Sequence, residues 1–178
     1  MPANRTAATR SLITFGAAGA CLGGGLRIVS SFIPWTPASP WLESLYGVID
    51  LGLLFGLIGV YLSVAEAIGR LGLAFFVLSL SAQASLVGPE ANLFGIDFCQ
   101  LGAAGVLLGL GCLALKMVQA RVKRIPAGPW LASALIGFGS TALHSAIGIL
   151  VCGVILGLGF VVAGGVILQT RGPSPTPA

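Results

Sequence analysis

The length of its apolar runs is the feature that most constrains this chain. From Trp130 to Gln169 the sequence holds 40 consecutive residues, of which only His144 could carry a charge. A single helix of that length would rise about 60 Å, whereas the hydrocarbon core of a bilayer is about 30 Å thick. The run therefore predicts two membrane-spanning helices, over residues 129–143 and 147–169, with a reversal around His144, Ser145 and Gly148.

The rest of the chain repeats this pattern. Four more apolar runs, each close to the length that a span needs, cover residues 11–33, 44–65, 71–87 and 95–115. Only 8% of the residues are charged, against about 25% in an average soluble domain. We therefore expect an all-α integral membrane protein with six transmembrane helices, arranged as three antiparallel hairpins.

The basic residues predict the orientation of these helices. Lys and Arg are enriched in cytoplasmic loops, and with six spans eight of the nine basic residues fall on one side. These eight are Arg5, Arg10, Arg70, Lys116, Arg121, Lys123, Arg124 and Arg171. We expect a cytoplasmic N-terminal tail over residues 1–10, a single transmembrane domain over 11–170, and a Pro-rich cytoplasmic C-terminal tail over 171–178. The first run should be a retained anchor helix, and the bacterial inner membrane is the expected location.

The net charge of +4 follows from this orientation and predicts no nucleic-acid partner. The basic stretch Lys116–Arg124 should instead attract anionic lipid headgroups.

Glycine is unusually frequent within the apolar runs, with 27 glycines in 178 residues. Glycines four positions apart lie on one helix face and let another backbone approach closely. Such pairs are Gly19 and Gly23, Gly52 and Gly56, Gly105 and Gly109, and Gly153 and Gly157. They predict close helix packing, either within the bundle or against other membrane protein subunits.

Arg27 and Asp50 lie deep inside predicted spans, where charges are costly and usually functional. Arg27 is about six residues before the end of the first span, and Asp50 is about six residues after the start of the second. Both should lie at a similar depth on adjacent helices, so we predict an intramembrane ion pair. It either locks the first hairpin or forms a polar opening that binds a solute or an ion.

Further polar residues should gather on the outer side, as a cluster of Glu43, Glu90, Asp97 and Gln100. The second and fourth spans also begin with similar segments, 46–50 (YGVID) and 94–97 (FGID), which suggests duplicated hairpins. Trp130 should mark the inner membrane interface.

Catalytic and cofactor signals are weak. The sequence has no zinc-protease motif, P-loop or dinucleotide fingerprint, so we expect no enzyme activity, no metal site and no cofactor. His144, the sole histidine, leaves open a haem- or pigment-binding module. The cysteines should be packing residues, with a disulfide between Cys99 and Cys152 as an alternative.

These features favour a non-catalytic structural or accessory subunit of a larger membrane complex. A small-solute or ion transporter with an outer polar site near Arg27, Asp50 and Asp97 is the alternative from a different class. A pigment- or haem-binding module through His144 is the third hypothesis.

Overall fold

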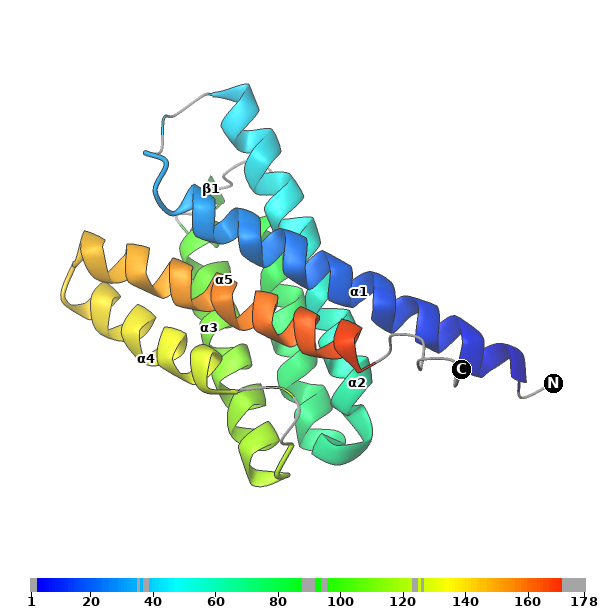
Figure 1. Cartoon of the computed structure of the whole chain (residues 1–178). Helices are drawn as coiled ribbons and strands as arrows, with labels where there is room; N and C mark the ends of the chain where they lie inside the picture. The colour runs from blue at the N-terminus through cyan, green and yellow to red at the C-terminus, as the bar shows by residue number, and fades with distance from the viewer. Residues whose placement is uncertain are drawn as a thin grey trace.

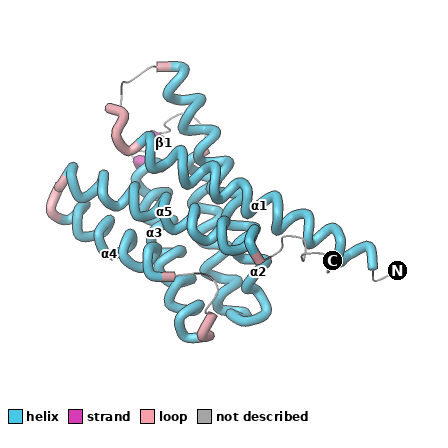
Figure 2. The backbone as a smooth tube through the Cα atoms, in the orientation of Figure 1, coloured by secondary structure: helices cyan, strands magenta, loops and turns pink. Residues whose placement is uncertain are grey.

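The computed structural model is a bundle of helices (Figures 1 and 2). It describes residues 3–34, 36, 39–87, 92–93, 96–122, 125 and 127–170, without the side chains of 3–6, 92–93 and 96. The elements are α1 (Ala3–Ser30), α2 (Pro40–Leu86), β1 (Asn92–Leu93), β2 (Ile96–Asp97), α3 (Phe98–Gln119), α4 (Gly128–Ala142) and α5 (Ala146–Gln169). The two short strands pair antiparallel, with Asn92 opposite Asp97.

In the part of the chain that the structure describes, four helices are long and apolar enough to cross a membrane, namely α1 from Ala7, α2, α3 and α5. This finding confirms the expectation of a helical chain with several membrane-type segments. Helix α4 has 15 residues and rises only about 22 Å, less than the hydrocarbon thickness. The six spans, their hairpin arrangement and their orientation stay predictions.

Helix α2 reverses direction at Gly69. That residue has φ +63° and ψ −161°, a conformation that is open essentially only to glycine. In a straight helix Asp50 and Gln83 would lie about 50 Å apart, yet their side chains are hydrogen-bonded at 3.0 Å. The rings of Tyr61 and Phe76 likewise stack at 4.0 Å. Helix α2 is therefore two antiparallel segments, residues 40–68 and 70–86, and Figure 1 shows the reversal between its cyan and green parts.

A second reversal joins α4 to α5. His144 has φ +50°, and the backbone N–H of Ser145 donates to the Ser140 carbonyl at 2.9 Å, which closes the end of α4 as in a Schellman motif. The Ser145 hydroxyl then caps α5 by accepting from the Gly148 N–H at 3.2 Å. The helix ends agree with the predicted reversal at His144 and Ser145, whereas Gly148, which was expected to belong to it, lies in the first turn of α5.

Helix α1 packs against both the first segment of α2 and α5, while α3 packs against the second segment of α2 and α4. Trp130, at the start of α4, is completely buried, and its ring meets Phe160 of α5 edge to face with centroids 5.4 Å apart. Trp130 is thus a packing residue between helices, in contrast to the exposed anchor that the sequence predicts.

Candidate functional site

Glycines bring α1 and α2 into backbone contact. A Cβ placed on Gly23 would stand 2.7 Å from the Gly52 carbonyl carbon, and one on Gly56 would stand 2.8 Å from the Cα of Ala20. Gly19 also lies against Gly52, because a Cβ placed on Gly19 would stand 3.1 Å from the Gly52 carbonyl oxygen. No larger residue fits at Gly23 or Gly56 unless the two helices move apart.

A second glycine contact joins α1 to α5 on another face of α1. A Cβ on Gly24 would stand 2.5 Å from the Gly157 carbonyl oxygen, and one on Gly157 would stand 2.6 Å from the Gly24 carbonyl oxygen. Helix α1 is thus held between α2 and α5 through neighbouring glycines.

Gly105 and Gly109 of α3 face the second segment of α2. A Cβ on Gly105 would stand 2.8 Å from the Ala82 Cβ, and one on Gly109 would collide with Ser79. Together with Gly153, described below, all eight glycines singled out in the sequence therefore lie where another helix packs.

Between these glycine contacts lies a group of three polar side chains, Arg27, Asp50 and Gln83, which we call the polar cluster. They come from α1 and from both segments of α2. The Gln83 amide nitrogen donates to Asp50 Oδ1 at 3.0 Å, and Gln83 is only 3% exposed. Arg27 is close enough to exert an electrostatic effect on the Asp50 carboxylate, and both charged side chains are half-buried.

The structure brings Arg27 and Asp50 into one region, as the sequence predicts. Among the described residues, however, no hydrogen bond or ion pair joins them directly. The direct partner of Asp50 is the neutral Gln83. The predicted ion pair is thus an interaction through space in this structure.

Helix α5 supports the arginine. The Nε and Nη2 atoms of Arg27 lie 3.6 Å from the position that a Cβ on Gly153 would occupy, and the Ser31 hydroxyl lies 2.8 Å from it. Gly153 therefore leaves room for the guanidinium and Ser31 against the α5 backbone. Tyr46 approaches from α2, and its hydroxyl donates to the Ser30 carbonyl at 3.5 Å.

Sequence reasoning missed Gln83. A signal was present, because Gln83 is the one amide within the predicted 71–87 span. Its partner depends on the reversal at Gly69, which sets residue 83 beside residue 50.

Among the described members of the predicted outer cluster, the structure shows one hydrogen bond, a helix-capping contact between Asp97 and the Gln100 backbone. The Asp97 carboxylate caps α3, with Oδ1 accepting from the backbone N–H groups of Cys99 at 2.9 Å and Gln100 at 3.0 Å. Glu43 is exposed in the first turn of α2, and Glu90 lies outside the described residues. Because Asp97 is a helix cap and Asp50 lies inside a helix, the two similar sequence segments do not place their aspartates equivalently.

The cofactor and metal candidates find little support in the described part of the chain. His144 is exposed at the tip between α4 and α5, away from the bundle interior where a pigment would sit. No group of three metal-binding side chains occurs among the described residues. Cys152 forms no disulfide, so the disulfide alternative is wrong. The Cys152 thiol instead donates to the Ser133 carbonyl at 3.2 Å.

Only part of the predicted basic stretch is described. The Lys116 ammonium donates to the Gln119 side chain at 2.9 Å, and Arg121 is exposed just after α3. Lys123 and Arg124 lie outside the described residues.

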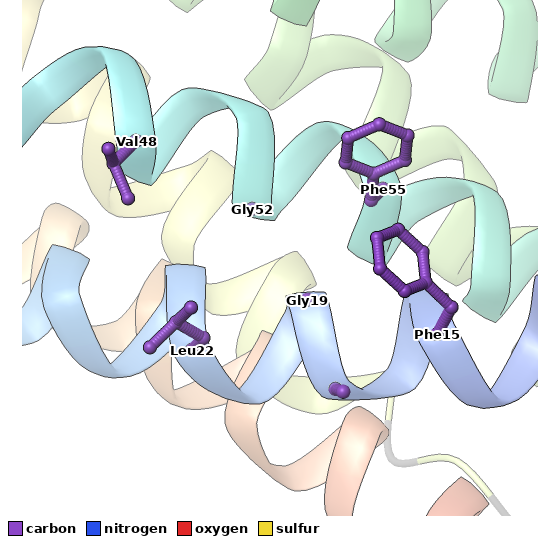
Figure 3. A pocket seen from close by; sticks show the side chains of 7 residues that line it. Phe15, Gly19, Leu22, Val48, Gly52 and Phe55 are labelled. Carbon is purple, nitrogen blue, oxygen red and sulfur yellow. The ribbon is translucent and has the colours of Figure 1, made fainter.

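An apolar groove of about 390 Å³ runs along the outside of α1 and α2. Gly19 and Gly52 lie at its floor, and larger side chains flank it (Figure 3). The rings of Phe15 and Phe55 meet edge to face at one end, with centroids 5.3 Å apart.

Comparisons with protein families, with curated proteins and with solved structures find no match to this chain.

Proposed function

We propose that this is a non-enzymatic, six-span membrane protein that binds a small polar solute or ion at the polar cluster and carries it across the membrane. The single observation that carries the proposal is the Asp50–Gln83 hydrogen bond beside Arg27, in the region where α1, both segments of α2 and α5 meet. Polar and charged groups within a membrane bundle are costly and are usually kept for function.

The proposed topology follows from the two reversals. If α1, the two segments of α2, α3, α4 and α5 each cross the membrane, both tails and all the basic residues except Arg27 fall on the cytoplasmic side. The polar cluster then lies toward the outer side, because Arg27 is in the last turn of α1 and Asp50 is near the start of α2. Reporter fusions after residues 87 and 178 test this topology, with an outside and an inside signal expected; two signals on the same side would contradict it.

Uptake into proteoliposomes tests the transport function. We expect the purified protein to move at least one small polar solute, and we expect Asp50→Asn to abolish that movement. Glu43→Gln is the matched control, since it also neutralises an acidic residue near the start of α2 but lies outside the cluster. Uptake that survives Asp50→Asn would refute the assigned site, and the absence of uptake for every solute class would refute the function.

A second candidate function is a structural or accessory subunit of a membrane complex, and the groove in Figure 3 favours it. A glycine floor flanked by larger apolar side chains is a surface on which a helix of another membrane protein packs well. Purification in mild detergent with mass spectrometry of co-purifying chains tests this candidate. Recovery of this chain alone at monomer mass would count against it.

The proposed partners are the lipids and, for the second candidate, other integral membrane subunits. Anionic headgroups are the proposed partners of the basic stretch Lys116–Arg124, whose charges would lie at the cytoplasmic interface in this topology.

A further inference from the structure

The polar cluster holds two opposite full charges that do not neutralise each other by direct contact. Gln83 donates to Asp50 Oδ1, and no described residue donates to Oδ2. The Arg27 guanidinium, which has five N–H donors, likewise has no hydrogen-bonded acceptor among the described residues. Both side chains are half-buried, so each is partly exposed and keeps hydrogen-bonding positions that no described residue fills.

The surrounding helices hold these charges in separate places. Gln83 is buried and fixes one oxygen of the carboxylate. Gly153 of α5 has no side chain, and the guanidinium lies next to the position that its Cβ would occupy. The two groups are thus supported from different helices, Asp50 from the second segment of α2 and Arg27 from α5.

We infer that the polar cluster selects a zwitterion, binding its ammonium group at Asp50 and its carboxylate or phosphate group at Arg27. This inference rests on the proposed function and specifies its ligand. A simple anion would be attracted by Arg27 but repelled by Asp50. A simple cation would be attracted by Asp50 but repelled by Arg27. Because like-charge repulsion is an effective means of rejecting a ligand, only a molecule with both charges satisfies both residues.

Two sources provide this chemistry. One is a free amino acid, and the other is the phosphoethanolamine headgroup of a membrane lipid. Both present an ammonium group and an anionic group a few bonds apart.

Binding to the purified wild-type protein in detergent tests the inference, with the shift in melting temperature and calorimetry as measurements. The probes are glycine and glycerophosphoethanolamine as zwitterions, glycerol 3-phosphate as an anion, and ethanolamine as a cation. We expect at least one zwitterion to bind at least tenfold more tightly than either singly charged probe. Binding of glycine alone assigns the free amino acid, and binding of glycerophosphoethanolamine assigns the lipid headgroup.

Charge-removing variants should change the selectivity in opposite directions. Asp50→Asn should weaken zwitterion binding at least tenfold and gain affinity for glycerol 3-phosphate. Arg27→Gln should weaken it equally and gain affinity for ethanolamine, while Glu43→Gln should keep the wild-type selectivity. Circular dichroism identifies any variant that fails to fold, and the wild-type comparison decides the inference without the variants.

The outcomes separate the inference from the function on which it rests. A wild-type protein that binds the anion or the cation as tightly as the zwitterions overturns the inference and leaves the proposed solute site standing. A wild-type protein that binds none of the four probes also overturns the inference, and if it transports no solute the proposed function falls with it.

Discussion

Three consecutive glycines in α1 give the sharpest test of the packing. A Cβ on Gly23 would stand 2.7 Å from the backbone of α2, and one on Gly24 would stand 2.5 Å from the Gly157 carbonyl oxygen of α5. A Cβ on Gly25 would meet nothing within 4 Å. Replacing each by alanine therefore makes the same chemical change in three different surroundings.

The expected magnitudes follow from these distances. Alanine is favoured over glycine inside a helix by about 1 kcal/mol, and that gain is common to all three variants. At Gly23 and Gly24 the added methyl group collides with backbone, so whole helices must separate, and such overpacking costs about 1–3 kcal/mol. We expect Gly25→Ala to be neutral or slightly stabilising. Gly23→Ala and Gly24→Ala should each be less stable than Gly25→Ala by about 2 kcal/mol, roughly a thirtyfold change in the unfolding equilibrium.

Reversible unfolding by SDS titration in mild detergent, followed by circular dichroism, measures these differences. Gly25→Ala serves as the control, because it shares the helix, the substitution and the neighbouring sequence. If Gly23→Ala and Gly24→Ala are as stable as Gly25→Ala, the close contacts of α1 with α2 and α5 do not exist as described, and the packing argument fails.

Three further substitutions test other parts of the fold by the same titration. Gly69→Ala should destabilise the protein by about 1–3 kcal/mol, because alanine is strained at φ +63°. The control is Gly165→Ala, which adds a methyl group in open space within α5 and should not destabilise the protein. Equal effects of the two substitutions would contradict the reversal in α2. Asp97→Ala should cost about 1 kcal/mol and speed hydrogen exchange of the first-turn amides of α3, since it removes the cap of that helix; unchanged exchange would refute the cap. Trp130→Phe should change the stability by less than about 1.5 kcal/mol, because it removes a buried N–H that has no hydrogen-bond partner. Trp130→Ala should cost about 3–5 kcal/mol, as expected for a large side chain lost from the interior; similar losses for both Trp130 variants would show that the indole N–H itself is essential.

Much of the helical architecture was accessible from the sequence, because it depends on local composition. Apolar runs of limited length must end or turn, so the breaks near residue 69 and around His144 could be placed from the pattern alone. The positions of Arg27 and Asp50 along their helices differ from the expected six residues, because α1 ends at Ser30, three residues after Arg27, and α2 begins at Pro40, ten residues before Asp50. Helix ends that depend on capping were harder, and Asp97 was expected to be part of a polar cluster where it caps α3.

Only the tertiary structure decided which residues meet. Gln83 is 33 positions from Asp50, and its partnership exists because α2 folds back at Gly69. Tryptophan is a residue type typical of membrane interfaces, yet the ring of Trp130 packs against Phe160 of α5.

The triplet Gly23-Gly24-Gly25 shows most simply what the sequence determined and what the tertiary structure decided. The sequence by itself determined that α1 is an apolar helix with glycines capable of close approach. It could not show which of the three glycines contacts another helix. Successive positions on a helix point about 100° apart, and which direction is occupied depends on where the neighbouring helices pack. The packing of α2 and α5 around α1 made Gly23 and Gly24 points of contact and left Gly25 open.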